Sequence, residues 1–155
     1  MPPAALALGA GVAQAVLAGQ VPPSRASRVA AFAVTIASAG LLLSSVAAFR
    51  REGTTVDPLA VERAEALVTG GACSMTRNPM YLSMAGLLLA HATLRRSWAA
   101  IVPAGAFLVL IDRMQIPAEE EALRKQFGSA FDDYARRTPR WLGSHFLSPI
   151  RSPHH

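Results

Sequence analysis

Two short segments carry most of the residues whose types suit binding or catalysis. The first, residues 67–81, reads LVTGGACSMTRNPMY and combines glycines with an arginine, an asparagine and a tyrosine. The second follows Pro117 and contains the consecutive carboxylates Glu119, Glu120 and Glu121. Carboxylates accept hydrogen bonds from hydroxyl groups or balance a positive charge, and exposed backbone amides bind further polar groups. Taken alone, the first segment is also typical of a connector, and the second of a solvated helix start whose dipole favours acidic residues.

The composition indicates that these segments belong to a membrane protein. Hydrophobic residues make up 52% of the 155 residues, the mean hydropathy is +0.30 and only 16% of residues are charged. The net charge of +5 would suit nucleic acid, but the basic residues border apolar blocks and few aromatics accompany them, so a membrane surface explains them better. The single cysteine excludes an internal disulfide and a multi-cysteine metal site, and we expect no metal.

Four apolar segments predict an all-α bundle of about four transmembrane helices, in a single domain over residues 1–155. One of them is the clearest, because its uncharged run makes about 30 Å of helix, the thickness of a bilayer core. The first contains glutamines and glycines and is the least secure, and the last two are short enough to form a re-entrant hairpin instead. The expected spans are residues 4–21, 29–49 (the clearest), 79–94 and 98–116, with a polar connector at 50–78 and a C-terminal helix and tail at 117–155.

Several finer expectations follow from single residues. Gly40 and Ser44 are small residues four apart, which would let a neighbouring helix approach closely; the alternative is a lipid-facing helix on which these small residues are incidental. The connector is expected to hold a short helix over residues 59–68, and Gly128 is expected to interrupt the C-terminal helix. His91 is expected to be a packed or interfacial histidine, because no second metal ligand lies near it in the sequence.

The distribution of charge predicts the orientation of the bundle. With four spans, both termini share a side with the connector, and this side carries eleven of the fifteen basic residues. The positive-inside rule then places both termini and both polar segments in the cytoplasm, with Arg140–Trp141 as an interfacial anchor. The richness in alanine and arginine suggests a bacterial inner membrane. The basic residues of the opposite side are Arg25, Arg28, Arg95 and Arg96.

Brought together at one membrane surface, the two polar segments could hold a soluble, cationic, ribose-bearing cofactor while a lipophilic partner enters from the bilayer. The ordered set of motifs also resembles the isoprenylcysteine carboxyl methyltransferase and phospholipid methyltransferase group of integral membrane enzymes, which use S-adenosylmethionine. The likeness covers Phe49 to Trp141 and includes Gly53-Thr54, Pro58, Leu67-Val68-Thr69-Gly70, Arg77-Asn78-Pro79-Met80-Tyr81, Glu119-Glu120-x-x-Leu123-x-x-x-Phe127-Gly128, Tyr134 and Pro139-Arg140.

The resemblance implies a cofactor site split between the glycine-containing loop and the acidic segment. S-adenosylmethionine would be bound here and S-adenosylhomocysteine released, and the acceptor would be a lipophilic molecule or a membrane lipid. The candidates to orient the acceptor are Glu119, Glu120 and the pair Asp112-Arg113. Gln115 stands where the carboxyl-methylating branch has an arginine. The residues that the resemblance assigns to the cofactor are Leu67, Val68, Cys73, Arg77, Asn78, Pro79, Met80, Tyr81, Glu119 and Glu120.

Some positions depart from the family pattern. Asn78 replaces the family's histidine, which excludes a histidine base there, and Cys73 replaces a common tyrosine, which would leave the cofactor pocket more open. Ser83 replaces a common glycine, and Gln115 makes isoprenylcysteine a doubtful substrate. The departures at Cys73 and Gln115 keep open a non-catalytic membrane protein with a vestigial cofactor site. A membrane reductase of the sterol-reductase type that binds NADPH also stays open, because such proteins share a broadly similar carboxy-terminal pattern.

Overall fold

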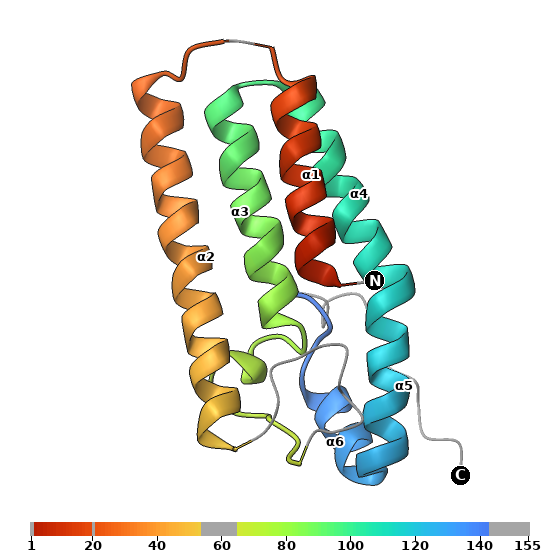
Figure 1. Cartoon of the computed structure of the whole chain (residues 1–155). Coiled ribbons are helices and arrows are strands. Elements are labelled where there is room, and N and C mark those ends of the chain that lie inside the picture. The colour runs from red at the N-terminus through yellow and green to blue at the C-terminus, as the bar shows by residue number, and fades with distance from the viewer. Residues whose placement is uncertain (1, 20, 54–64, 143–155) are drawn as a thin grey trace, which may run out of the picture.

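The computed structural model describes residues 2–19, 21–53 and 65–142, and in these ranges the chain contains helices and no strands (Figure 1). The expectation of an all-α fold is therefore confirmed for the part that the structure describes. The helices are α1 (Pro3–Leu17), α2 (Arg25–Arg51), the 3₁₀ helix η2 (Gly71–Ser74), α3 (Pro79–Arg95), the 3₁₀ helix η3 (Trp98–Ala100), α4 (Ile101–Leu110), the π-helical turn η4 (Ile111–Gln115), α5 (Ile116–Phe127) and α6 (Ser129–Arg137).

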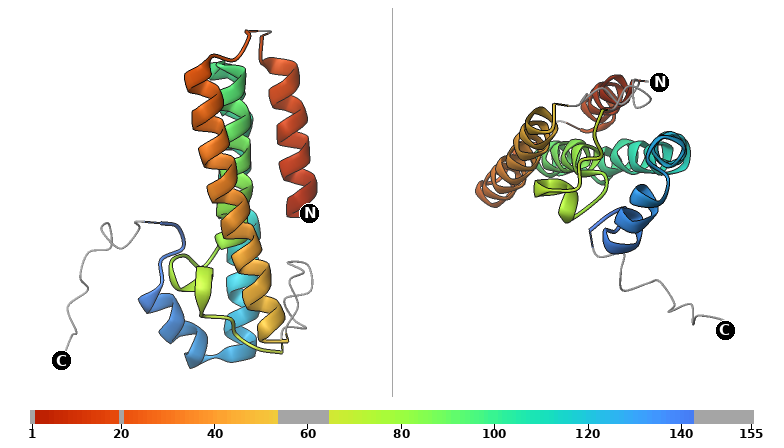
Figure 2. Two further views of the ribbon diagram at one scale, coloured as in Figure 1. Left: turned by 90° about the vertical axis from the view of Figure 1, so that its left-hand side faces the viewer. Right: turned by 90° about the horizontal axis from the view of Figure 1, so that it is seen from below.

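The long helices form an elongated bundle with α3 at its centre. Seen along its axis, α2, α3 and α4 lie in a row, α1 packs on one side of that row, and α6 lies on the other (Figure 2). The turns from α1 to α2 and from α3 to η3 lie at one end, where Arg96 donates a hydrogen bond of 3.3 Å to the Pro22 carbonyl. The α5–α6 unit and η2 lie at the other end, so both polar segments meet there, as the sequence predicts.

Helix α2 approaches α3 closely through a row of small side chains. Ala31, Ser38 and Ser45 are buried at intervals of seven residues, which keeps them on one side of the helix. Opposite them, a Cβ atom added to Gly86 of α3 would lie 2.1 Å from Ser38 Oγ. Of the two interpretations of Gly40, close helix approach was wrong, because a Cβ there would meet nothing within 4 Å.

Helix α1 is fastened to the bundle by one buried amide. Gln14 Nε2 donates to the carbonyls of Leu88 at 2.9 Å and Ala100 at 2.7 Å, and Gln14 Oε1 lies 2.9 Å from His91 Nδ1. Arg95 Nε donates to His91 Nε2, so the imidazole carries its proton on Nδ1 and donates to Gln14. The expectation of a packed His91 is confirmed, and the glutamine that weakens α1 as an apolar segment joins it to α3 and η3.

The final apolar segment does not stop at Ile116. From Trp98 to Phe127 the chain is helical throughout, passing from α4 through the π-helical turn η4 into α5. The expected separate helix after Pro117 was wrong, because a π-turn can absorb the missing N–H and the bulk of a proline without ending the helix. The predicted interruption at Gly128 is confirmed: this glycine has φ +52° and separates α5 from α6.

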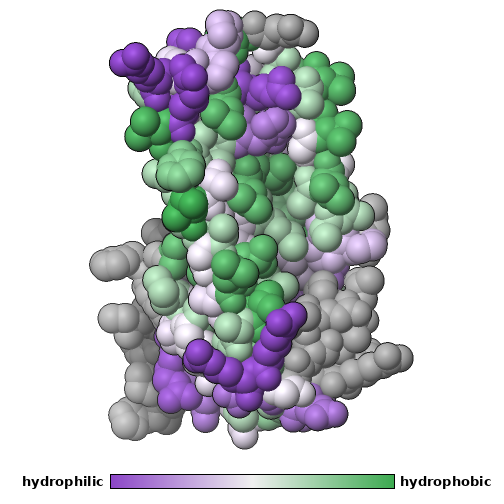
Figure 3. All heavy atoms as spheres, turned by 60° about the vertical axis from the view of Figure 1, so that its left-hand side comes forward, coloured by the Kyte–Doolittle hydropathy of each residue, from purple (hydrophilic) through white to green (hydrophobic). Residues whose placement is uncertain are grey.

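The outer surface of the bundle is apolar along its middle. Two helices of the described chain, α2 and the continuous helix Trp98–Phe127, are long and apolar enough to cross a membrane. Figure 3 shows hydrophobic residues over the middle of one face and hydrophilic residues towards both ends. A water-soluble bundle would bury such residues, whereas a bilayer solvates them. Exposed large hydrophobic residues include Val12, Val16, Val29, Phe32, Ile36, Leu43, Val102 and Val109.

Part of the connector and the tail fall outside the described residues. The expected helix at 59–68 lies mostly within 54–64, which the structure does not describe, and residues 65–68 are not helical. The loop then forms η2, which ends just before the bend into α3.

Candidate functional site

The bend that leads into α3 is bound to the segment after α6, here called the strap (Thr138–Trp141). The backbone N–H of Arg77 donates to the Pro139 carbonyl at 2.9 Å. The carbonyl of Arg140 accepts from Thr76 Oγ1 at 2.8 Å and from Asn78 Nδ2 at 3.1 Å. Thr76 and Asn78 are buried, so these bonds satisfy polar groups that have lost contact with water. Asn78 therefore holds the strap by its amide.

A half-buried ion pair network ties the bend, α5 and the strap together. Glu120 accepts from Arg77 Nη2 at 2.8 Å and from Arg140 Nη2 at 2.6 Å, with Arg140 Nε at 3.2 Å. Arg77 Nη1 also donates to the carbonyls of Ala135 and Thr138, at 2.9 and 2.7 Å. Hydrogen bonding to Glu120 raises the pKa of Arg140, so its guanidinium stays charged. Each carboxylate oxygen of Glu120 accepts from at least one of the two arginines.

The strap also reaches the π-helical turn. Asp112 Oδ1 accepts from Trp141 Nε1 at 2.8 Å and lies 3.4 Å from Arg140 Nη1. The indole N–H thus points towards the protein and binds a carboxylate. Arg140 and Trp141, expected as an interfacial anchor, therefore connect the strap to η4. Burial of Trp141 is only partial, since the residue is neither fully covered nor fully exposed.

A second cluster joins α3 to the acidic segment. Tyr81 donates a short hydrogen bond to Glu119 Oε1, and Gln115 Nε2 donates to the same oxygen at 2.8 Å. Tyr81 is only 5% exposed, which fixes its ring against the core residues Ala85, Leu88 and Phe107. Among the described residues both bonds of Glu119 go to Oε1, which leaves its second oxygen as an acceptor for a ligand.

The loop residues assigned to the cofactor gather against α6. Val68 and Cys73 are buried with Phe131 and Tyr134, and Leu67 packs at the edge of this cluster. Tyr134 donates its phenol hydrogen to the Cys73 carbonyl at 2.7 Å, and burial raises the pKa of this phenol. Cys73, which is smaller than the tyrosine common in the family, is therefore covered by Phe131 and Tyr134 of α6.

Cys73 is expected to react slowly with thiol reagents in the folded protein. It is 2% exposed, and burial raises its pKa to about 11, so the reactive thiolate is rare at pH 7.5. Maleimide labelling followed by mass spectrometry should be at least about 100-fold slower in the native protein than in the denatured chain. In a Cys73→Ala, Ser74→Cys variant the thiol moves to an exposed neighbour, and rapid native labelling is expected. Equal rates for the two proteins would show that the loop does not close over Cys73.

The remaining candidates are placed less centrally. Arg113 is 80% exposed at its side chain and lies 3.8 Å from Asp112, outside the Tyr81–Glu119 cluster. Pro79 is buried at the first turn of α3, and Met80 is half-buried beside it. Sequence reasoning left Thr76 out of the predicted site, because its contact is made with the strap, about 60 residues further along the chain. The candidate Asp112 also contacts the strap, through Trp141, about 30 residues further along. The strap's own motif, Pro139-Arg140, was the available signal.

Comparison with known proteins adds a decisive observation. The family model described as phospholipid methyltransferase matches residues 26–130, about two thirds of the chain. The chain belongs to the phospholipid methyltransferase family. No curated protein and no solved structure matches it. The match covers α2, α3, the continuous last helix and the loop between them, so the two polar clusters are formed mainly within the region that defines a family of membrane methyltransferases.

The donor set at this end suits the cofactor that the phospholipid methyltransferase family implies. Glu119 offers a carboxylate oxygen that can accept from hydroxyl groups. Arg77 Nε is buried and donates to nothing among the described residues, so a ligand acceptor such as a carboxylate would satisfy it. Glu120 is different, because both of its oxygens already accept from arginines. The site therefore fits a ligand that has hydroxyl groups and a carboxylate.

Proposed function

We propose that the chain is an integral membrane methyltransferase that moves a methyl group from S-adenosylmethionine to a lipophilic or membrane-embedded acceptor. The observation that supports this most strongly is the meeting of Tyr81 and Glu119, and of Arg77 and Glu120, at one end of an apolar bundle. These residues come from the two separate segments that the family resemblance assigns to a shared cofactor site. Family membership supports the methyl transfer, and the apolar surface supports an acceptor that arrives through the bilayer.

The residues of the site have distinct roles in this proposal. S-adenosylmethionine supplies an activated methyl group on a sulfonium, so positioning and exclusion of water can account for much of the acceleration. Glu119 accepts hydroxyl hydrogens through its second oxygen, while Tyr81 and Gln115 hold the carboxylate in place. Arg77 supplies a buried donor for a carboxylate, and Leu67 and Val68 form an apolar wall with α6.

The acceptor would reach the site along the last helix. Leu110 and Met114 are exposed large hydrophobic residues on either side of Asp112 in the chain. Glu119 and Asp112 are then the carboxylates available to orient the reacting group, with Gln115 beside them and Arg113 at the exposed edge. The positive-inside rule supports a cytoplasmic site with both termini on the same side, and the composition suits a bacterial inner membrane.

The proposal is tested by calorimetry of S-adenosylhomocysteine binding to the purified protein in detergent and in nanodiscs. Glu119→Gln keeps an acceptor for Tyr81 but removes the charge that strengthens bonds to hydroxyl groups, so affinity should fall about tenfold or more. Glu121→Gln is the matched control: this neighbouring side chain is 65% exposed and pairs with Lys125. Its affinity should equal that of the wild type.

Three results would contradict the proposal. An absence of heat in both media would exclude the cofactor. Displacement of S-adenosylhomocysteine by NADPH at similar concentration would favour the reductase alternative. Binding without any methylated product from a membrane extract would favour a non-catalytic protein with a vestigial site.

A further inference from the structure

The end of the bundle opposite the methyltransferase site is strongly cationic. It carries Arg25, Arg28, Arg95 and Arg96, whereas all ten acidic residues lie within residues 52–65 and 112–133. The described stretches at this end, from α1 through the start of α2 and from α3 into α4, therefore contain no carboxylate. An excess of guanidinium groups at a membrane boundary attracts anionic groups, and a lipid phosphate is the anion that a bilayer supplies there.

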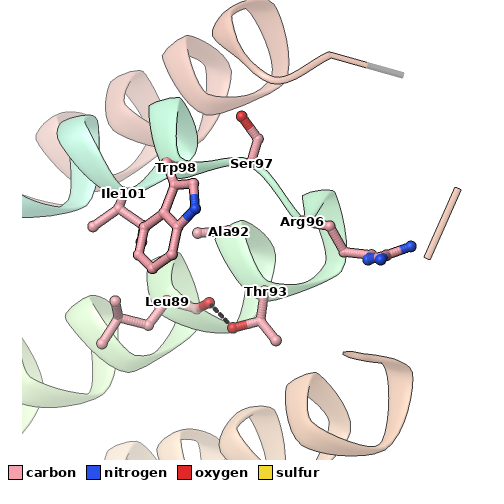
Figure 4. Close-up of a pocket in the computed structure, with 7 residues that line it drawn as sticks. All are labelled: Leu89, Ala92, Thr93, Arg96, Ser97, Trp98 and Ile101. Carbon is pink, nitrogen blue, oxygen red and sulfur yellow. Dashed lines mark hydrogen bonds between the residues drawn. The ribbon is translucent and has the colours of Figure 1, made fainter. Parts of the chain in front are cut away.

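A cavity of about 280 Å³ opens at this end, between the last turns of α3 and the start of α4. Figure 4 shows that its lining changes character from one side to the other. Leu89, Ile101 and the Trp98 indole lie at one side, and the Arg96 guanidinium extends at the other. Such a gradient matches a molecule with an apolar chain and an anionic head, and matches a free anion poorly.

Two residues of the lining have properties that suit a lipid. Trp98 is 86% exposed in the protein alone. In a bilayer, an indole beside apolar helices is favoured at the boundary between acyl chains and headgroups. Arg96 has φ 49° and ψ 35°, the left-handed conformation that usually belongs to glycine at a helix end. An arginine here is disfavoured by about 1 kcal/mol relative to glycine, yet it places a guanidinium at the cavity rim.

The polar groups near Arg96 leave room for a phosphate. Arg96 Nη1 makes one exposed bond of 3.3 Å to the Pro22 carbonyl. The Thr93 hydroxyl donates to the Leu89 carbonyl at 2.8 Å and keeps its oxygen as an acceptor, and Ser97 lines the same rim. A phosphodiester would accept from Arg96 and Ser97 while its glycerol hydroxyls donate to Thr93.

We propose that this cavity is a binding site for one anionic phospholipid of the adjoining leaflet, with the phosphate at Arg96 and an acyl chain along Leu89, Trp98 and Ile101. The site is separate from the methyltransferase site, so occupancy here does not depend on binding of S-adenosylmethionine. The bound lipid would help to hold together the α1–α2 and α3–η3 turns, which the hydrogen bond from Arg96 to the Pro22 carbonyl already connects.

The test uses quenching of tryptophan fluorescence by lipids brominated on the acyl chain, with the full-length protein in vesicles. Brominated phosphatidylglycerol is expected to quench Trp98 with about fivefold higher apparent affinity than brominated phosphatidylcholine, the effect of about one arginine near a membrane surface. In Trp98→Phe the preferential quenching should disappear, because the remaining tryptophan, Trp141, is bound to Asp112 in η4 and does not line this cavity.

Arg96→Gly removes the guanidinium and its exposed bond to Pro22, but glycine suits the left-handed backbone, so the variant should fold about as well as the wild type. The ratio of the apparent affinities for the two brominated lipids should fall to about one. Arg28→Gln is the control for charge alone, because Arg28 lies at the same end but does not line the cavity. An unchanged preference in Arg28→Gln supports a defined site. Equal losses in the two variants, no preference in the wild type, or full competition by soluble glycerol phosphate would each overturn the proposal.

Discussion

Replacing Glu120 by alanine is expected to lower the melting temperature of the detergent-solubilised protein by about 5–10 °C. The substitution leaves Arg77 and Arg140 half-buried without their shared carboxylate, and removal of one partner from such a pair costs about 2–3 kcal/mol when some solvent remains. The strap should loosen as well, and trypsin should cleave more quickly after Arg137 and Arg140. Thermal unfolding and timed proteolysis measure the two effects.

The control for this prediction is the neighbouring Glu121→Ala. Its exposed ion pair with Lys125 is expected to contribute less than about 0.5 kcal/mol, so the melting temperature should barely change. The variants Glu120→Ala and Arg140→Ala should also be less than additive in combination, because they remove one shared interaction. Equal melting temperatures for Glu120→Ala and Glu121→Ala would show that the network does not fasten the strap.

Replacing Gly86 by leucine is expected to separate α2 from α3 and to lower stability by about 2–3 kcal/mol. Even a Cβ at this position would lie 2.1 Å from Ser38 Oγ and 3.2 Å from Ser38 Cβ, so a larger side chain must displace α2. Close helix approach through small residues is the main source of packing between helices in a membrane, where lipid tails are as apolar as the side chains. Thermal unfolding in detergent gives the measurement.

Gly40→Leu serves as the matched control because it makes the same change on the exposed side of α2. A Cβ at Gly40 meets nothing within 4 Å, so stability should stay equal or rise slightly with the better helix former. The size swap Gly86→Ala with Ser38→Gly should regain most of what Gly86→Ala alone loses. Failure of the swap together with a stable Gly86→Leu variant would exclude a tight α2–α3 contact.

The order of the helices and the meeting of the two polar segments could be predicted from the sequence. Apolar length indicated where the helices of the bundle lie, although the last one continues past residue 116 to Phe127. The Asn78–Pro79 step correctly marked the start of α3. The family motifs indicated that Tyr81 and the glutamates would come together. Local chemistry was sufficient here because each signal depends on residue types close together in the chain.

The contacts that close the candidate site could not be predicted in the same way. The Arg140 carbonyl accepts from Thr76 and Asn78, and a backbone acceptor leaves no trace in residue identity. Gln14 weakened the prediction of the first helix because it is polar, although the carbonyls of Leu88 and Ala100 accept hydrogen bonds from its amide. The interpretation of Gly40 as a helix contact failed for a similar reason, since spacing alone does not say which side of a helix meets its neighbour.

The π-helical turn at Ile111–Gln115 determines where the carboxylates point. A π-turn contains one residue more than an α-turn, and each residue of an α-helix advances the chain by about 100° around the axis. With regular α-helical winding through this turn, Glu119 and Glu120 would be rotated by about that angle away from Tyr81 and Arg77. The direction in which Glu119 and Glu120 point is thus set by the number of residues in the turn before them. The turn should therefore tolerate substitution of its side chains more readily than insertion or deletion of a residue.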